Sequence, residues 1–400
     1  MTNFDEKVKA LVAHAYENAP AIKKQLNDAG LTPDDIQSIA DLAKIPVLSK
    51  DSLVEIHQQN PPFGGFLTVD PDTLPRIYIS PGPIFDPQPP VEDPDIFAEP
   101  FKYIGIGNSD RVLNTFAYHL TPAGLLLDDL LRHCGATVIP SGPGNTELQI
   151  MMAMALNVTG FVGQPSYLMS ILDKIEEQGM GPDSFPIKKA LFSAEPYTPT
   201  QQARFEGEYG MKTTSAYGTA DLGFLGYTKE GVQGFKLFES AYMQIVDPKT
   251  GEDVEPGNQG EVVVTLFNNA YPLLRFGTGD LGVLNPAGVD GSQNLLGLFG
   301  RSGDAIKVRG MFLHPNQLKQ AAMQFPSIGK MQAVITRPDN KDVVTLRIAL
   351  KDGGEDAKLA ATLQELAKNA VRLRIDSVEF VSMDDFGDNQ RTIVDNREWD

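Results

Sequence analysis

The sequence predicts an α/β protein with two domains. We expect a large N-terminal domain with mostly parallel sheets flanked by helices plus a β-rich subdomain, and a small α+β C-terminal domain. Strand-like segments alternate with amphipathic helices between residues 111 and 217, which is typical of a parallel sheet covered on both faces. Later residues change to hairpin-like β segments, and 400 residues exceed what one core usually serves. The domains are expected at residues 1–300 and 304–400, with a hinge at 301–303.

We expect short helices in residues 4–56 and, after a short strand, an irregular loop in residues 80–90. Residues 4–56 carry apolar side chains at helical spacing, and Thr32 followed by Pro33 is a helix start. A short strand is expected at 74–79. Residues 80–90 are rich in proline, which cannot donate ladder hydrogen bonds, so we expect an irregular surface loop there.

A helix is expected between each pair of consecutive parallel strands. The strands are expected at residues 111–116, 136–141, 158–162, 188–194 and 212–217. The helices between them are expected from Pro122, from Asn145, at 166–178 and at 198–209. The later β segments are expected at 261–267, 295–299 and 377–381, with a hairpin turn at 339–340 and helices at 315–325 and 355–370.

Composition excludes several classes of function. The 34 basic and 52 acidic residues leave a net charge of −18, which disfavours binding to nucleic acid or to an anionic membrane surface. The single cysteine, Cys134, excludes an internal disulfide and a multi-cysteine metal site. The N-terminus has charges and no apolar core, and no stretch is long and apolar enough to span a membrane. A cytoplasmic protein is therefore expected.

Candidate site residues follow two neighbouring strands of the predicted sheet. In open α/β sheets, ligands bind outside the carboxyl ends of the strands. Two consecutive strands end in the loops 193–197 and 217–223, which carry Glu195, Tyr217 and Asp221. A tyrosine beside a glycine turn could stack on a flat base, and a carboxylate could hold a cation or a ribose hydroxyl. On spacing alone, the alternative stays open that both acids are solvated and that Tyr217 packs in the core.

Two further segments are candidates for a functional role, one because it presents an acid and one because it contains small residues at the domain boundary. The turn 275–281 presents Asp280, and the run 300–310 at the domain boundary contains glycines that can absorb the dihedral changes of a hinge. Gly105-Ile106-Gly107 is not a dinucleotide-binding loop, because a strand follows where that motif requires a helix.

Taken together, these segments resemble the phenylacetate–coenzyme A ligase family of the adenylate-forming superfamily. The loop 193–197 is similar to the family's adenine-contacting loop, and 217–221 to its tyrosine-glycine-x-Ser/Thr-Glu motif. Residues 272–281 resemble the ribose-binding aspartate motif, and 300–310 continuing to 315–318 the hinge segment. The resemblance extends over further segments of the chain, namely 15–20, 29–36, 138–149 and 164–168.

The resemblance implies a nucleotide site. Glu195 and Pro196 would line the adenine pocket, Tyr217 would stack on the base with Gly218 beside it in the same motif, and Asp280 would bind the ribose hydroxyls.

It also implies residues for the rest of the reaction. Arg301 would lie near the ribose, Asp221 occupies the position of a magnesium-binding glutamate, and Lys307 that of a lysine used in the second half-reaction. Such enzymes join a carboxylic acid to AMP from ATP with loss of pyrophosphate, then rotate the small domain and transfer the acyl group to coenzyme A. The resemblance implies ATP or AMP, Mg²⁺, coenzyme A, an aryl or arylacetic acid and a homodimer.

Three positions depart from the family's pattern. The phosphate loop, Ser-Ser-Gly-Thr-Thr-Gly-Lys-Pro in the family, is here the proline-rich run 80–87, with Asp86 in place of the lysine. Asp388 replaces the C-terminal lysine that stabilises the adenylation transition state, and Gly303 replaces the usual charged hinge residue. Loss of one such electrostatic contact typically costs about 3–4 kcal/mol of transition-state stabilisation.

Two interpretations follow. The first is a phenylacetate–coenzyme A ligase-like, AMP-forming enzyme in which the adenylation half-reaction is impaired. The second is a degenerate, non-catalytic relative that acts as a nucleotide- or acyl-thioester-binding protein or as a partner protein. The reversed charges at Asp86 and Asp388 favour the second interpretation as far as reaction with ATP is concerned. The retained nucleotide-binding residues favour the first interpretation.

Overall fold

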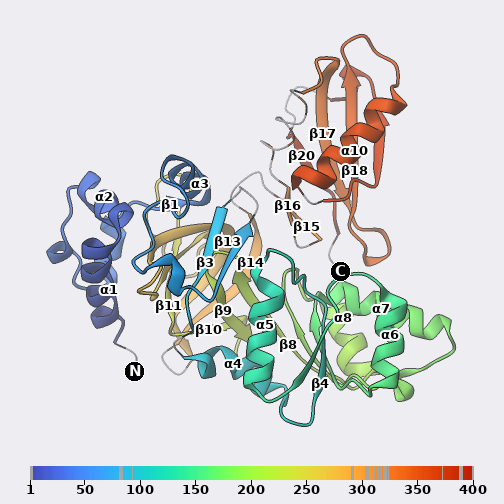
Figure 1. Cartoon of the computed structure of the whole chain (residues 1–400), viewed down its shortest axis with the longest axis horizontal. Helices are drawn as coiled ribbons and strands as arrows, with labels where there is room; N and C mark the ends of the chain where they lie inside the picture. The colour runs from blue at the N-terminus through green and yellow to red at the C-terminus, as the bar shows by residue number, and fades with distance from the viewer. Residues whose placement is uncertain are drawn as a thin grey trace. The chain divides into compact units, whose positions relative to one another are not determined.

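The computed structural model describes residues 3–80, 84–91, 93–289, 292–301, 306–309, 311–313, 315, 318, 322, 324–371, 373–386 and 391–398. The chain divides into two compact units, Met1–Ser302 and Gly303–Asp400 (Figure 1). Rotation about a hinge at 301–303 stays a prediction.

The parallel half of the large unit's sheet contains the five predicted strands. They are β4 (Arg111–Asn114), β5 (Thr137–Pro140), β6 (Gly160–Gly163), β7 (Lys189–Phe192) and β8 (Lys212–Thr219). Their order is β8-β7-β6-β4-β5, and every neighbouring pair is parallel. The prediction of a parallel α/β sheet is confirmed.

Helices cover both faces of these strands. Successive side chains of a strand point to opposite faces of the sheet, and here apolar side chains on each face pack against helices. Val112, Val162 and Leu191 pack in the same cluster as residues of α4 and α5, whereas Leu113 and Phe161 pack with residues of α6 and α7. The helices are α4 (Pro94–Tyr103), α5 (Pro122–His133), α6 (Thr146–Ala155), α7 (Pro165–Glu177) and α8 (Pro199–Gln202), which continues as a π-helix over Ala203–Glu208.

Beyond β8 the sheet becomes antiparallel, as expected for the β-rich part. Its strands are β9 (Gly223–Thr228), β10 (Phe235–Leu237), β11 (Ala241–Val246), β12 (Gly260–Leu266), β13 (Leu273–Val289) and β14 (Ser292–Arg301). The order is β11-β12-β13-β14-β10-β9-β8, and the short strand β1 (Leu48–Ser49) pairs in parallel with β13.

The N-terminal helices pack on this antiparallel part, and Val8, Leu11 and Phe276 lie in one buried cluster. These helices are α1 (Phe4–Asn18), α2 (Pro20–Asp28) and α3 (Lys50–Gln59), and short 3₁₀ turns lie at Pro33–Asp35, Ile39–Lys44, Pro71–Thr73 and Pro182–Ser184. Thr32 caps its turn as predicted, with Asp35 accepting in return from the Thr32 N–H.

The prediction of an irregular loop at 80–90 is wrong for residues 84–88. These residues form β3 (Ile84–Gln88), which pairs antiparallel with β2 (Arg76–Ser80). Pro87 lies opposite Ile77 in this isolated two-stranded pair. A two-stranded ribbon has a free edge on each strand, and at such an edge the missing N–H of proline is tolerated. Residues 81–83 lie outside the described part of the chain.

The small unit is α+β. Its sheet has the order β19-β18-β17-β20, and a separate antiparallel pair joins β15 to β16. The strands are β15 (Ile306–Val308), β16 (Met311–Leu313), β17 (Ile328–Thr336), β18 (Val343–Leu350), β19 (Ser377–Phe380) and β20 (Ile393–Asp395), with helix α10 (Ala357–Val371) and 3₁₀ turns at Pro338–Asn340 and Met383–Phe386. The predicted turn at 339–340 is confirmed, whereas the predicted helix 315–325 lies largely outside the described residues.

Within the part of the chain that the structure describes, no helix combines the length and apolar composition that a membrane span requires.

Candidate nucleotide site

The loops predicted to form a site do lie on neighbouring strands. β7 pairs in parallel with β8, with Phe192 opposite Ser215. Just beyond these residues, the Ser193 hydroxyl donates to the carbonyl oxygen of Ala216 at 2.8 Å. The loops 193–197 and 217–223 therefore leave the same edge of the sheet.

Glu195 is half-buried in the first of these loops. Its Oε1 accepts a hydrogen bond from the backbone N–H of Ser166 at 2.6 Å, at the start of α7, where the helix dipole favours a carboxylate. Ala194 adopts a φ of +78°, a left-handed conformation that is strained for a residue with a Cβ. Such strain clusters at functional sites. Pro196 is exposed, and contact of both residues with adenine stays a prediction.

Tyr217 and Asp280 are joined by a hydrogen bond. The Tyr217 hydroxyl donates to Asp280 Oδ2 at 2.9 Å, and the Tyr217 side chain is 6% exposed. The two residues belong to β8 and β13, which are separated in the sheet by three other strands. The fold thus brings together the two side chains that the resemblance assigns to base and ribose.

Gly218 allows a close approach between β8 and β9. A Cβ placed on Gly218 would lie 2.5 Å from the carbonyl oxygen of Gly223, a distance that real Cβ atoms do not reach. The register between β8 and β9 also shifts at this point. Glycine is therefore required here to fold the turn that carries Asp221.

Asp221 forms an ion pair that sequence reasoning missed. Lys50 Nζ lies 3.1 Å from Asp221 Oδ1 and 2.8 Å from Oδ2, and the Asp221 side chain is 4% exposed. Lys50 is the first residue of α3. A cation is unfavourable at that end of a helix dipole, and this was the available sequence signal for a specific role.

A buried arginine holds the segment that leads to Lys50. The guanidinium of Arg275, 2% exposed, donates to the carbonyl oxygens of Ala43 and Ile45 at 3.1 and 2.6 Å, and to that of Gly251 at 2.7 Å. The chain then forms β1, pairs with β13 and enters α3 at Lys50. Arg275 is thus a positioning residue for the Lys50–Asp221 pair.

The Lys50–Asp221 pair does not fit the magnesium site that the resemblance implies. Mg²⁺ binds carboxylate oxygens at about 2.1 Å, so an ion on Asp221 would lie about 4 Å from the Lys50 ammonium. The repulsion between them would be about 8 kcal/mol at an effective dielectric constant of 20. Among the described residues, moreover, no group of three or more His, Cys, Asp or Glu side chains is arranged to hold a metal.

A second acid lies near this pair. Asp86, at the position of the family's phosphate-loop lysine, is 8% exposed. Burial, and then the charges of Asp86 and Asp221, raise the pKa of the Tyr271 hydroxyl well above its ordinary value. That hydroxyl lies 2.9 Å from Nε2 of His57, whose pKa is lowered by burial, against the opposing effect of Asp221. Two carboxyl groups therefore influence Tyr271, and one of them, Asp86, stands where the resemblance places a lysine.

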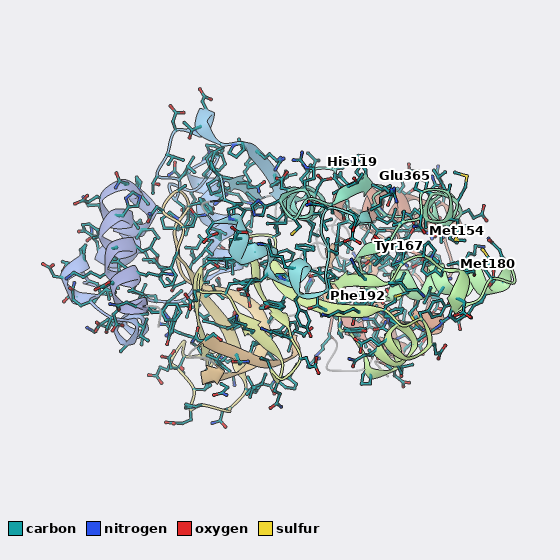
Figure 2. All side chains as sticks on the ribbon, turned by 90° about the horizontal axis from the view of Figure 1, so that it is seen from below. His119, Met154, Tyr167, Met180, Phe192 and Glu365 are labelled. Carbon is teal, nitrogen blue, oxygen red and sulfur yellow. The ribbon has the colours of Figure 1, made fainter. Side chains whose placement is uncertain are left out.

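The carboxyl ends of β4 and β5 form a separate polar network. Gln149, 2% exposed, donates to the hydroxyl of Ser141 at 3.0 Å and to the carbonyl oxygen of Gly142 at 2.8 Å. The Tyr167 hydroxyl lies within hydrogen-bonding distance of Gln149 Oε1 and of Gly144 O. Figure 2 labels Tyr167 and, on β7 in the same half of the sheet, Phe192, which packs against Tyr197 with ring centroids 4.8 Å apart.

The remaining predicted residues lie at the end of the large unit or in the small one. Arg301 is opposite Asp280 in the β13–β14 ladder, and Lys307 belongs to β15. The side chains of both, and the whole of Gly303 and Asp388, lie outside the described part of the chain.

Comparison with known proteins gives consistent results. The AMP-binding enzyme family matches residues 118–269. The chain is 30% identical to the phenylacetate-coenzyme A ligase of Aromatoleum evansii over 91% of this chain and 84% of that protein, and 27% identical to the ligase of the same name from Escherichia coli (strain K12) over 95% and 88%.

Solved structures share the fold. A 2-hydroxyisobutyryl-CoA ligase, in complex with 2-HIB-AMP and CoA in the thioesterification state, superposes with a TM-score of 0.89 at 23% identity, over 99% of this chain and 89% of that one. The sequence relatives, which extend over most of both chains, identify the family. Within the adenylate-forming superfamily, the chain belongs to the phenylacetate–coenzyme A ligase family, whose members are AMP-forming acid–thiol ligases.

Proposed function

We propose that this protein binds an adenine nucleotide together with an aryl or arylacetic acyl group, and transfers the acyl group from an acyl-adenylate to coenzyme A. The hydrogen bond between Tyr217 and Asp280 carries this proposal, since it joins the two side chains expected at the base and the ribose. Glu195 follows β7, the strand that pairs with the strand of Tyr217, and accepts a hydrogen bond from the start of α7; it is proposed to complete the adenine pocket.

We further propose that the first half-reaction, formation of the acyl-adenylate from ATP, is weak. Adenylation needs positive charge around the α-phosphate and the leaving pyrophosphate, and preorganised charge is usually the largest catalytic contribution. Asp86 is buried where the family has a lysine, and Asp388 replaces the other lysine. Two carboxylates thus replace two cations.

The second half-reaction has no triphosphate to stabilise. The sulfur of coenzyme A attacks the acyl carbonyl carbon, the bond from that carbon to the AMP phosphate oxygen breaks, and AMP leaves with that bonding pair. The thiol proton passes to solvent. Lys307 is proposed to lie near AMP during this step, and the carboxylate class is proposed from the relatives named phenylacetate-coenzyme A ligase.

Two assays on the purified protein test the proposal. Pyrophosphate exchange is measured over a panel of carboxylates that includes phenylacetate and 2-hydroxyisobutyrate, and we expect negligible exchange with all of them. Synthetic phenylacetyl-adenylate is then mixed with coenzyme A, and we expect phenylacetyl-coenzyme A by mass spectrometry. Lys307→Ala should slow this transfer, whereas Lys358→Ala, at an exposed lysine of the same unit, should not.

Each outcome separates the alternatives. Robust pyrophosphate exchange would restore a complete ligase and overturn the proposed loss of adenylation. Binding of AMP without any transfer from the synthetic adenylate would favour the second candidate, a nucleotide- or acyl-thioester-binding protein, for which the buried acid Asp86 is the specific observation. A homodimer stays a prediction that sedimentation can test.

A further inference from the structure

Asp221 stands at the position where the family resemblance places a magnesium ligand, and it is paired with Lys50. We propose that this pair replaces the metal: the Lys50 ammonium, held by Asp221, donates charge-assisted hydrogen bonds to the phosphate of AMP or of an acyl-adenylate, so the nucleotide binds without a divalent cation. The inference rests on the nucleotide binding proposed above and specifies the cation that accompanies it.

The charges match an acyl-adenylate better than ATP. The phosphate of an acyl-adenylate carries one negative charge, because one of its oxygens is linked to ribose and another to the acyl group. The Lys50 ammonium can donate charge-assisted hydrogen bonds to such a monoanion while it stays paired with Asp221. A triphosphate carries several more charges, which a divalent cation normally offsets. Here the carboxyl groups of Asp86 and Asp221 both contribute to raising the pKa of Tyr271, and the same two groups would oppose those additional charges.

Lys50 is held rigidly enough to act as a fixed cation. Ser49 caps α3 by accepting from the Ser52 N–H at 3.1 Å, which fixes the first turn that carries Lys50. β1 immediately before it pairs with Phe276 and Gly277 of β13, the strand that also carries Asp280. The phosphate cation and the ribose ligand are thus anchored to one strand.

Exposure of the pair is asymmetric. The Lys50 side chain is 23% exposed, so solvent and ligand can reach it, whereas Asp221 is 4% exposed. Asp221 therefore acts as a buried anchor that orients the ammonium. A positioned donor of this kind loses little entropy when a phosphate binds, which favours binding.

Calorimetric titration of the full-length protein tests this directly. AMP and adenosine are titrated in buffer that contains either Mg²⁺ or EDTA. We expect the AMP affinity of the unmodified protein to agree within about twofold between the two buffers. Lys50→Met should weaken AMP binding by about tenfold to a hundredfold while leaving adenosine binding unchanged, since only AMP has a phosphate.

The same variant gives a second readout. In Lys50→Met, both oxygens of Asp221 are released from the ammonium, so Mg²⁺ should now strengthen AMP binding, and additional Asp221→Asn should abolish that gain. Lys24→Met is the matched control. It removes a lysine whose ion pair with Asp28 is largely exposed on α2, and it should change neither titration.

The results that would overturn the replacement of the metal by Lys50 differ from those that would overturn the proposed function. A tenfold or greater loss of AMP affinity in EDTA by the unmodified protein would overturn the replacement of the metal while leaving nucleotide binding intact. An equal loss of adenosine and AMP binding in Lys50→Met would show a purely structural role and would overturn it too. Binding of neither ligand in either buffer would overturn both this inference and the proposed function.

Discussion

The two ends of the proposed nucleotide site differ in the interactions that hold them. At the end assigned to base and ribose, the contacts are hydrogen bonds, from the Tyr217 hydroxyl to Asp280 and from the start of α7 to Glu195. At the phosphate end, the described contacts involve charge, with Lys50 paired to Asp221 and the acid Asp86 buried nearby. By the resemblance, the first end keeps the residue types of the family, whereas at the second end Asp86 stands in the position of a lysine.

On the proposed function, binding and chemistry are altered separately within one fold. Hydrogen bonds of the Tyr217–Asp280 type need only geometry, which the sheet preserves. Catalysis of adenylation depends on the sign of nearby charges, and a single substitution such as lysine to aspartate reverses that sign without altering the fold. The following predictions test this separation, from the largest expected effect to the smallest.

Arg275→Met should have the largest effect on stability. The change leaves three carbonyl oxygens without their donor in a buried place, and we expect a loss of about 3–5 kcal/mol in the free energy of unfolding. Chemical denaturation measures it. Arg132→Met, at a largely exposed arginine of α5, should lose less than about 1 kcal/mol. Equal losses would contradict the role given to Arg275.

Gly218→Ala should disturb both ends of the site together. Its Cβ would meet the Gly223 carbonyl oxygen, so the turn must shift, at a cost of about 1–3 kcal/mol of stability. Because Tyr217 and Asp221 flank this turn, AMP affinity should fall as well. Gly207→Ala, where a Cβ meets nothing within 4 Å, is the control. Unchanged AMP binding by Gly218→Ala would separate the turn from the site.

Tyr217→Phe should affect only the base and ribose end. It removes the hydroxyl that orients Asp280, so we expect a loss of about 1 kcal/mol in stability and about fivefold in affinity for both adenosine and AMP. Tyr227→Phe, which removes a comparable hydroxyl bond to Glu99, should leave both affinities unchanged. A loss confined to AMP would assign Tyr217 to the phosphate end instead.

His57 should give the phosphate end a weak pH dependence. Burial lowers the pKa of His57 in the folded protein, so below the ordinary histidine range the unfolded chain binds a proton that the folded chain does not. As the pH is lowered from about 7.5 to about 5.5, the free energy of unfolding should therefore fall. His57→Gln should flatten that slope in denaturation midpoints, whereas His119→Gln, at an exposed position, should not.

The sequence by itself determined most of the architecture. Apolar periodicity and the helix starts at Pro122 and Asn145 located the parallel half of the sheet, because those signals depend on residues within a few positions of one another. The same local reasoning failed at residues 84–88. Prolines weaken a strand, but the pairing with β2 that tolerates them is not visible in the segment itself.

Only the tertiary structure decided the partners at the phosphate end. Lys50 and Asp221 are 171 positions apart, and Arg275 lies 230 positions from Ile45, whose carbonyl oxygen accepts its hydrogen bond. No local period encodes such pairs, since they depend on how β1 and α3 are placed against β13. The sequence could assign Asp221 to a cation by resemblance. That the cation beside Asp221 is the ammonium of Lys50 follows from the tertiary structure, because the pairing of β1 with β13 places the start of α3 beside the turn that contains Asp221.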